Sequence, residues 1–415
     1  MADRHVDVLL IGGGVASASC AAALRDGGFE GSILLAGRES DPPYNRPPAS
    51  KGYLAGTETR ADALYHPAGW YEANDVELLT RASAMKLDAA GMEVRLATKE
   101  TVRFDQALLA TGANVRRLTV DGADLDGIHY LRALGNADAI RDDVPEGGRV
   151  VLIGGSYIGS EVAATLTSIG RRCTIVMQEE HPLSTGFGDT AGRWFGELLS
   201  SRGIEIHGGE QLERMEGSGD RVQRVVLAGG AQLGADAVVL GVGAVPDVML
   251  AKAAGLELGE HGGVRCDSRL RTSAEGIFAA GDVCQYDSVV HGRPLRVEHW
   301  DVAVQQGRTV AANMLGADRA HEAIPYFFSD LSDWVSLEYV GPASAGWDEE
   351  VVRGSLEEGA FSIWYLKDNR LAAALSVGRS GDLDDARRLI ASGADVGEQA
   401  AQLRDAGSDL SAIGA

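Results

Sequence analysis

Two glycine-rich stretches of this sequence have the residue types and the spacing needed to hold a dinucleotide pyrophosphate. Each stretch follows a short apolar run and precedes small residues suited to opening a helix. The positions that match the pattern G-x-G-x-x-G are Gly12, Gly14 and Ser17 in the first stretch and Gly154, Ser156 and Gly159 in the second. In such a turn, backbone N–H groups approach phosphate oxygens at the start of a helix. The repetition predicts two bound dinucleotides, one that supplies a hydride and one that receives it.

Two of these positions depart from glycine. Ser17 is small enough for a helix to pack closely on its strand, whereas Ser156 adds a side chain where the backbone must approach a phosphate. The Ser156 hydroxyl can still donate a hydrogen bond to a phosphate oxygen. One imperfect copy of the pattern is as often a plain strand–helix turn as a nucleotide site. Two copies, each between a strand and a helix, favour dinucleotide binding.

A carboxylate after the second strand of such a unit holds the adenosine ribose. After the strand that follows the first helix come Arg38 and Glu39, and Glu39 is the candidate. In the second copy the usual position holds Met177, with Glu179 two residues further on. No pair of arginines stands there to receive a 2′-phosphate, so NADH is favoured and NADPH remains the alternative.

The elements around the two turns repeat in the order strand, helix, strand. Predicted strands lie at 6–11, 32–37, 149–155 and 173–178, and predicted helices at 16–28 and 157–170. Continuous apolar runs of this kind are typical of buried parallel strands. Further predicted elements are a hairpin at 92–104, strands at 105–113, 203–209, 221–230, 235–247 and 276–284, and a helix at 301–315. The predicted fold class is α/β, with two Rossmann-like dinucleotide-binding domains.

The last part of the chain, from about residue 325, has a different pattern. Two strands flank an Asp-Asn turn within 361–378, and a helix follows at 382–393. This combination predicts a separate small α+β domain. The tail from Asp395 is weakly patterned and is expected to be loosely ordered.

The composition is that of a globular protein, with 45% hydrophobic and 24% charged residues and a formal net charge of −22. That charge argues against nucleic acid and against an anionic membrane surface as partners, because phosphate binding needs clustered Lys and Arg. The uncharged segment 8–24 is too rich in Gly, Ala and Ser for a membrane span, and Asp3 and Asp7 spoil a signal-peptide start. A cytoplasmic protein is expected.

The four cysteines form no C-x-x-C or C-x4-C pair; they are Cys20, Cys173, Cys266 and Cys284. Disulfide scaffolds and dithiol relays are therefore disfavoured, and four reduced, mostly buried thiols are expected. No second His or Cys lies at ligand spacing from His299, so no metal site is predicted.

Five further segments carry a resemblance to a known family. They are PYNRPPASK (43–51), LLATGA (108–113), IFAAGD (277–282), RVEHWDVAVQQGRTVAANMLG (296–316) and PYFFSDLSDWVSLEYVG (325–341). Over nearly its whole length the sequence resembles the FAD-dependent pyridine nucleotide-disulfide oxidoreductases. Within them it is most similar to the ferredoxin and rubredoxin reductases that serve oxygenases, and also to the apoptosis-inducing-factor branch. The resemblance implies an FAD domain at 1–112 and 245–325, an NAD(P)H domain at 113–244 and a C-terminal domain at 326–415.

The resemblance also implies which residues contact the cofactors. Those implied for FAD are Gly12, Gly14, Ser17, Arg46, Lys51, Ala110, Thr111, Gly112, Gly281, Asp282, Glu298, His299 and Trp300. Those implied for NAD are Gly154, Gly155, Ser156, Tyr157, Ile158, Gly159, Glu161 and Gly243. Further cofactor contacts are expected at Val15, Ala16, Arg38, Glu39, Ala82, Arg116, Glu179 and Phe328.

Lys51 and Glu161 are the residues expected to take part in catalysis. By the resemblance, Lys51 lies near the reactive edge of the flavin, Glu161 reaches the nicotinamide, and the two pair with each other. Phe328 stands where the family's FWSD segment has Trp, which keeps an aromatic contact and loses an indole donor. Plainer interpretations are a surface cation for Lys51, a helix-face charge for Glu161, a capping role for Asp282 and partial core packing for Trp300 and Phe328.

The expected reaction is hydride transfer from NADH to flavin N5, in which the protein holds the two rings face to face. Because no dithiol follows the flavin, the electrons are expected to leave directly to a small one-electron carrier such as a ferredoxin. A quinone or oxygen is the alternative acceptor. Two other functions stay open: a slow NADH-responsive flavoprotein like the apoptosis-inducing factor, and a nucleotide-binding module without turnover. Monomer and homodimer both stay open.

Overall fold

The structure is a computed structural model that describes residues 3–342 and 346–414. The chain passes back and forth between two units. Unit 1 consists of Met1–Asn45, Ala61–Asn114 and Ala244–Pro325, and unit 2 consists of Arg46–Arg60, Val115–Gly243 and Tyr326–Ala415. Residues 46–60 therefore belong to unit 2, although both neighbouring segments belong to unit 1.

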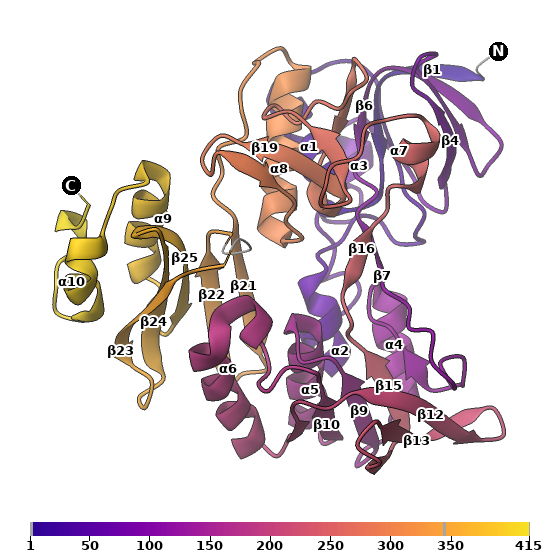
Figure 1. Cartoon of the computed structure of the whole chain (residues 1–415). Helices are drawn as coiled ribbons and strands as arrows, with labels where there is room; N and C mark the ends of the chain where they lie inside the picture. The colour runs from indigo at the N-terminus through magenta and orange to yellow at the C-terminus, as the bar shows by residue number, and fades with distance from the viewer. Residues whose placement is uncertain (1–2, 343–345, 415) are drawn as a thin grey trace. The chain divides into compact units, whose positions relative to one another are not determined.

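Unit 1 is built on a sheet in the strand order β3-β2-β1-β6-β5-β4, with β18 beside β6 (Figure 1). The strands are β1 (Arg4–Ile11), β2 (Ile33–Ala36), β3 (Val76–Leu79), β4 (Ala84–Asp88), β5 (Glu93–Leu96), β6 (Thr101–Leu109) and β18 (Ile277–Ala279). β1, β2, β3, β6 and β18 run parallel to one another, whereas β5 pairs antiparallel with β4 and β6. The predicted buried strands and the predicted hairpin are confirmed.

The parallel strands of unit 1 end in one row. In the register of the sheet, Ile11 pairs with both Ala36 and Leu109, Ala36 pairs with Leu79, and Leu109 pairs with Ala279. The residues that follow these strands therefore emerge along the same edge. At this edge, between β1 and β6, the strand order reverses, which is where open α/β sheets bind ligands.

Helix α1 (Val15–Asp26) follows β1 and packs against α8 (Trp300–Met314). The two helices come close because Gly307 has no side chain: a Cβ there would lie 2.2 Å from Ser19 Oγ. The remaining elements of unit 1 are α3 (Trp70–Ala73), α7 (Met249–Ala253), β17 (Val264–Cys266), η2 (Gly281–Val283), β19 (Cys284–Ser288) and β20 (Arg293–Leu295). β7 (Ala113–Val115) and β16 (Ala244–Pro246) stand where the chain passes between the units.

The middle segment of unit 2 repeats the plan of unit 1. Its sheet has the order β11-β10-β9-β15-β8 and is parallel throughout. The elements are β8 (Ile128–His129), α4 (Leu134–Asp143), β9 (Arg149–Ile153), α5 (Tyr157–Ser168), β10 (Arg172–Val176), α6 (Ser184–Ser201), β11 (Glu205–His207) and β15 (Ala237–Leu240). Ile153 pairs with both Val176 and Leu240, so the loops after β9, β10 and β15 also emerge along one edge.

An antiparallel sheet of three strands shares a hydrophobic core with this parallel sheet. It consists of β12 (Leu212–Ser218), β13 (Arg221–Leu227) and β14 (Gln232–Gly234). Val225 and Leu227 of β13 pack with Val151, Val176 and Val238 of the parallel sheet, and all five side chains are buried. This shared core holds β9 and the loop that follows it in place.

Residues 46–60 are fastened to the helices of unit 2. They form η1 (Pro47–Ser50) and α2 (Gly52–Ala55), which contact α4 and α5. The Tyr53 hydroxyl donates a hydrogen bond to Asp138 at 2.7 Å. Arg60 and Arg141 both pair with Asp138, and both guanidinium groups lie over the Tyr53 ring. This short excursion is therefore packed into the same unit as the second glycine turn.

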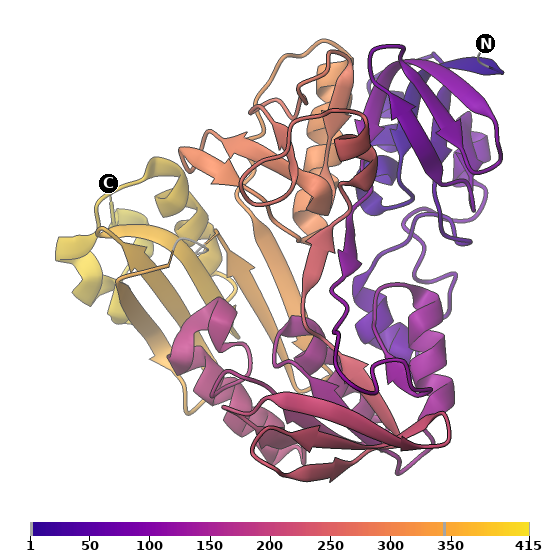
Figure 2. The same ribbon diagram turned by 45° about the vertical axis from the view of Figure 1, so that its right-hand side comes forward.

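The C-terminal part of unit 2 is an antiparallel sheet with helices beside it (Figure 2). Its order is β21-β22-β25-β24-β23, with β21 (Tyr326–Leu331), β22 (Val335–Val340), β23 (Glu349–Ser355), β24 (Ala360–Lys367) and β25 (Arg370–Val377). The predicted turn between β24 and β25 is confirmed, with positive φ angles at Asp368 and Asn369 that suit a tight hairpin. The predicted helix is α9 (Asp382–Ser392), and α10 (Ala400–Arg404) contacts β23.

The expectation of a loosely ordered tail from Asp395 is wrong. Leu403, Leu410 and Ile413 of the tail are buried. Buried Arg353 of β23 donates hydrogen bonds to backbone carbonyls of residues 402–408. The tail is ordered by an arginine much earlier in the sequence, so its own residue pattern did not reveal this.

All four cysteines are free and buried, as expected. Among the described residues, no helix combines the length and the apolar character needed to cross a membrane.

Replacing Arg353 with Met is expected to release the tail, because several carbonyls lose their donor at once. We expect a loss of about 2–4 kcal/mol in the free energy of unfolding. Hydrogen exchange of residues 400–413 should accelerate more than exchange in β24. The control is Arg404→Met, whose side chain is 60% exposed and forms one ion pair at 3.7 Å; its effect should stay within about 0.5 kcal/mol. Unchanged exchange of the tail in Arg353→Met would contradict this account.

Candidate functional site

The first glycine turn passes very close to a neighbouring strand end in unit 1. Gly12 has φ +127°, and a Cβ on it would lie 2.1 Å from the carbonyl oxygen of Ala110, which follows β6. Both the backbone angle and the contact exclude other residues. Gly13 approaches Gly37 after β2 less closely: its ideal Cβ would lie 3.3 Å from Gly37 Cα. The loop is held between the ends of β2 and β6.

Gly14 differs from these two residues because the space beside it is open. It is the N-cap of α1, and an ideal Cβ on it meets no heavy atom within 4 Å. Ser17, in the first turn of α1, is fully buried, and its hydroxyl has no hydrogen-bond partner within the described residues. An open N-terminus, a glycine that lets a ligand approach and a spare buried hydroxyl together suit a phosphate group. Val15 and Ala16 beside them are buried.

Arg38 and Glu39 follow β2 on the same edge of unit 1. The Glu39 carboxylate accepts a hydrogen bond from the Tyr44 hydroxyl at 2.6 Å. Arg38 donates to Asn114 at 2.7 Å and to Asp247 at 3.1 Å. These contacts fix both side chains beside the first glycine turn. The sequence pattern pointed to Arg38 and Glu39 as candidates but gave no sign of the side chains that hold them.

The loops after β6 and β18 also contain predicted residues and are themselves braced. Thr111 Oγ1 donates to the carbonyl of Asp247 at 2.7 Å, and Gly112 adopts φ +72°. Gly281 adopts φ +76°, and its N–H donates to buried Gln306 of α8 at 2.7 Å. The neighbouring Asp282 is the middle residue of the 3-10 turn η2. Ala82, after β3, is buried, and its N–H donates to the carbonyl of Gly37.

Three further predicted residues stand at the start of α8. Trp300 donates its indole N–H to Asn45 Oδ1 at 3.0 Å, and Glu298 pairs with Arg296 at 2.5 Å. Burial lowers the pKa of His299 to about 4, so the imidazole is neutral at physiological pH. Trp300 and His299 thus contribute uncharged rings to this part of unit 1.

The second glycine turn, in unit 2, has the same construction as the first. Gly154 has φ +107°, and a Cβ on it would lie 2.4 Å from the carbonyl oxygen of Gly241, which follows β15. A Cβ on Gly159 would lie 2.0 Å from the Gly154 carbonyl oxygen, so α5 packs directly on the turn. The predicted need for glycine at both positions has a steric cause. Gly243 adopts φ +91° with open space around its ideal Cβ, and its carbonyl accepts the N–H of Arg116 at 2.9 Å.

The two departures from the pattern have structural explanations. Ser156 is exposed at the N-cap of α5 and donates to the Gly241 carbonyl at 3.2 Å. Met177 is buried, and a Cβ on Gly155 would lie 2.1 Å from its sulfur. The Met177 side chain thus fills the space beneath the turn. Glu179 is exposed at the same edge and accepts a hydrogen bond from Thr185 at 3.1 Å.

Lys51 and Glu161 form the expected ion pair, with Lys51 Nζ 2.6 Å from Glu161 Oε1. Glu161 is 6% exposed and lies in α5, two residues after Gly159. Its carboxylate also accepts hydrogen bonds from Ser50 and Ser329, each at 2.5 Å. Both serines escaped sequence reasoning, which followed the charged and aromatic residues of their motifs.

Other predicted residues of unit 2 have different surroundings. Arg46 donates to the carbonyl of Arg132 at 2.6 Å. Burial raises the pKa of Tyr157, whose ring contacts Phe187 and Phe327, so it remains a neutral phenol. Ile158 and Phe328, in contrast to Tyr157, have exposed side chains, at 39% and 41% of their surface.

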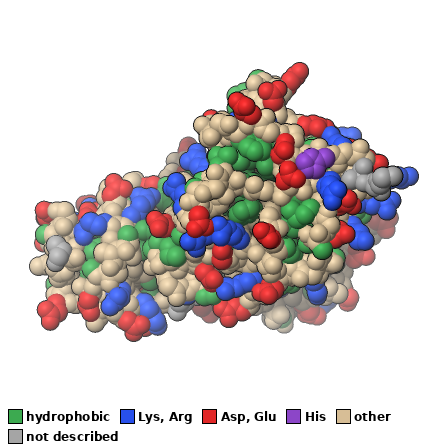
Figure 3. Space-filling model, turned by 90° about the horizontal axis from the view of Figure 1, so that it is seen from above, with side chains coloured by type: hydrophobic (Ala, Val, Ile, Leu, Met, Phe, Trp, Pro, Cys, Tyr) green, Lys and Arg blue, Asp and Glu red, His purple; other side chains and the backbone are tan. Residues whose placement is uncertain are grey.

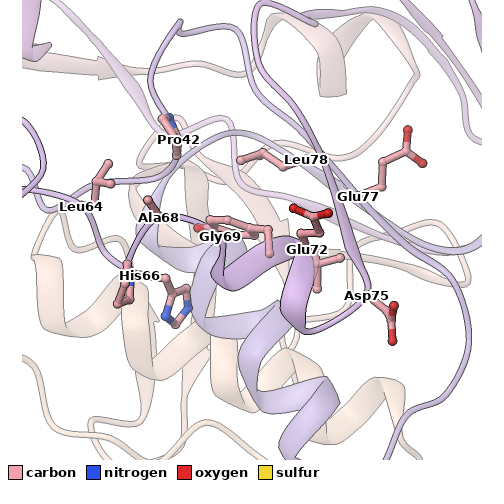
Figure 4. A pocket seen from close by; sticks show the side chains of 12 residues that line it. Pro42, Leu64, His66, Ala68, Gly69, Glu72, Asp75, Glu77 and Leu78 are labelled. Atoms are coloured by element: carbon pink, nitrogen blue, oxygen red, sulfur yellow. The ribbon is translucent and has the colours of Figure 1, made fainter.

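A separate hollow of about 600 Å³ lies beside α3 and β3 in unit 1 (Figure 4). Figure 4 shows His66 and the acidic side chains Glu72, Asp75 and Glu77 around it. None of the cofactor contacts predicted from the sequence lines this hollow. On the face drawn in Figure 3, acidic and basic side chains are interspersed rather than gathered by sign.

The chain matches two protein-family models and is similar to several known reductases. A family model described as pyridine nucleotide-disulphide oxidoreductase matches residues 6–307, and one described as reductase C-terminal matches residues 326–413. The chain is 35% identical, over 93% of its length and 94% of the relative's, to the anthranilate 1,2-dioxygenase system ferredoxin–NAD(+) reductase component of Burkholderia cepacia.

Two solved structures are similar over almost the whole chain. The ferredoxin reductase for the CYP199A2 system from Rhodopseudomonas palustris superimposes with a TM-score of 0.92 at 33% identity, covering 99% of both chains. The reductase in a covalent putidaredoxin reductase–putidaredoxin complex gives a TM-score of 0.91 at 31% identity, covering 99% of this chain and 98% of that one.

Alanine substitutions at Gly12 and Gly14 are expected to differ in how much they destabilise the cofactor-free protein. Gly12→Ala forces a Cβ against the Ala110 carbonyl at a positive φ, so unfolding should become easier by about 2–4 kcal/mol. Gly14→Ala meets open space and should cost less than about 1 kcal/mol. Urea unfolding of the cofactor-free protein measures both. Equal losses would show that the turn does not have this asymmetry.

Proposed function

The chain belongs to the pyridine nucleotide-disulphide oxidoreductase family, and we propose that it is an FAD-dependent NADH reductase that delivers electrons to a ferredoxin. The observation that carries the proposal is the pair of glycine turns built in the same way in the two units. Each turn joins a parallel strand to a helix at the edge where the strand order reverses. Two such sites in one chain suit a donor and an acceptor dinucleotide.

Unit 1 fits FAD. The open N-terminus of α1, Gly14 and the buried Ser17 hydroxyl would hold the pyrophosphate. Glu39, kept in place by Tyr44, would accept a hydrogen bond from the adenosine ribose. Asp282 would hold the ribityl chain. FAD, when bound, supplies the redox chemistry: it accepts a hydride and passes electrons on one at a time.

Unit 2 fits NADH. The N–H groups at the start of α5 would hold its pyrophosphate, and Gly243 leaves open space on the neighbouring loop. Glu179 would hold the ribose hydroxyls in place of the acid that Met177 replaces. Its neighbour Glu180 is also exposed, so a 2′-phosphate would meet two carboxylates. These charges support a preference for NADH over NADPH.

Lys51 and Glu161 would orient the reacting nucleotide and keep a positive charge in place during hydride transfer. Glu161 is part of the helix that begins at the nucleotide turn, so its carboxylate is rigidly placed relative to that turn. Lys51 Nζ is held by the Glu161 carboxylate at 2.6 Å, and its side chain is only 14% exposed. A fixed charge in a water-poor site stabilises developing negative charge more than a solvated one does.

Electrons would leave to an external carrier because the cysteines do not form a relay. All four are free and buried, and no two stand in a C-x-x-C or C-x4-C pair. The thiols of Cys266 and Cys284 are hydrogen-bonded to each other, but both lie in the interior, away from any carrier at the surface. The Burkholderia relative is named a ferredoxin–NAD(+) reductase component, and the putidaredoxin reductase was solved in a covalent complex with putidaredoxin. Both support a small iron–sulfur protein as the acceptor here.

Anaerobic titration of the purified protein tests this function. The protein should be yellow and bleach with one equivalent of NADH. Two equivalents of an oxidised ferredoxin, each taking one electron, should then restore the flavin colour. The ratio kcat/KM should favour NADH over NADPH by about tenfold or more, since each carboxylate disfavours the phosphate by about 1 kcal/mol. Glu179→Gln should narrow that ratio. A protein that stays colourless after incubation with FAD would overturn the proposal.

Lys51→Met should slow flavin reduction by NADH without unfolding the protein. The expected decrease in the limiting stopped-flow rate is about 10- to 100-fold, because orientation and a fixed charge are both lost. Lys367→Met is the matched control in the same unit: it removes an exposed ion pair with Asp348 at 3.0 Å. Equal rates for the Lys51 variant and the control would remove Lys51 from the mechanism.

A further inference from the structure

The Glu161 carboxylate receives more donors than an ion pair needs. Oε1 accepts from Lys51 Nζ at 2.6 Å and from Ser329 Oγ at 2.5 Å, and Oε2 accepts from Ser50 Oγ at 2.5 Å. The donors come from the excursion 46–60 and from β21, and all of them lie in unit 2. Both oxygens of a buried anion are thereby satisfied.

The two serines define the direction of the carboxylate, which a lysine alone does not. An ammonium on a four-carbon stem follows a carboxylate through many orientations. Short hydroxyl donors attached to rigid backbone leave much less freedom. With Ser329 on one oxygen and Ser50 on the other, rotation about the Glu161 side-chain torsions breaks at least one bond.

Each serine is itself held in place. The backbone carbonyl of Ser50 accepts a hydrogen bond from Thr165 Oγ1 at 2.8 Å. Thr165 lies one helical turn after Glu161 on α5, so one face of the helix holds both the side chain and the backbone of Ser50. Ser329 is 1% exposed and pairs with Leu337 across β21 and β22.

We propose that Ser329, with Ser50, is a positioning residue for hydride transfer: the hydroxyls orient Glu161, which in turn orients the Lys51 ammonium. The C-terminal sheet thereby contributes to the reaction through β21. This inference rests on the proposed function, since it gives the Lys51–Glu161 pair its role.

The matched control is another buried serine in the same sheet. Ser362 of β24 is fully buried, donates to Asp382 at 2.7 Å and accepts the indole N–H of Trp364 at 2.9 Å. Ser362→Ala and Ser329→Ala each delete one buried hydroxyl–carboxylate bond, but only Ser329 reaches Glu161. The limiting rate of flavin reduction should fall about tenfold in Ser329→Ala and stay within twofold of wild type in Ser362→Ala. Ser329→Thr, which keeps the hydroxyl and suits a strand, should restore most of the rate.

A double-variant cycle shows whether Ser329 acts through Lys51. In the Lys51→Met background, Ser329→Ala should have almost no further effect on the rate, because the group it orients is gone. Additive losses, or equal losses in Ser329→Ala and Ser362→Ala, would overturn the inference and leave Ser329 with a purely structural role.

A measurement without turnover complements the kinetics. In protein stripped of cofactor, Lys51 should react faster with acetic anhydride in Ser329→Ala than in wild type or Ser362→Ala, as read by mass spectrometry of the Lys51 peptide. Ser50→Ala should act in the same direction and serves if Ser329→Ala does not fold. Unchanged Lys51 labelling in the folded variants contradicts the inference. If wild-type protein is not reduced by NADH, the proposed function fails, whatever the labelling shows.

Discussion

In each of the two units, the glycine turn lies very close to the residues that follow a neighbouring strand of the same sheet, and the rest of the unit depends on this close approach. An ideal Cβ on Gly12 would lie 2.1 Å from the Ala110 carbonyl, and one on Gly154 would lie 2.4 Å from the Gly241 carbonyl. In each unit the turn is thus pressed against the strand that lies on the opposite side from its own crossover. The helix N-terminus is thereby aimed at the edge where the strand order reverses, and the other loops of the site are arranged around it.

The second constraint is the buried carboxylate of Glu161. A charge removed from water is costly unless its lone pairs are met, and removing one partner leaves the rest of the cost in place. Glu161 meets this requirement with groups from two other segments, which include Ser50 and Ser329. The excursion 46–60 and β21 are therefore bound to the helix that starts at the nucleotide turn. The Glu161 carboxylate thus connects α5 to two segments that are distant from it in the sequence.

The sequence was enough to predict the main helices and strands, but not the side-chain contacts that hold them in place. Apolar runs and glycine spacing predicted the two strand–helix–strand units, because those patterns reflect backbone needs local to each turn. The partners of the site were not predictable in this way. Ser329 is an ordinary strand serine until β21 is placed against α5, and Arg353 orders a tail whose own pattern is weak. Residue roles that depend on a distant segment leave no periodic signal in either segment.

The second glycine turn keeps its backbone geometry although Ser156 and Met177 replace the usual glycine and the usual acid. Met177 occupies the usual acid position but points beneath the turn, where its sulfur fills the space that a Cβ on Gly155 would need. Gly155 therefore carries a strict steric requirement, while Ser156 is exposed and tolerates a side chain. The carboxylate that Met177 lacks is available two residues later as Glu179, at the same edge. Because the strand register and the turn stay fixed, this edge keeps an exposed carboxylate although Met177 stands at the usual acid position.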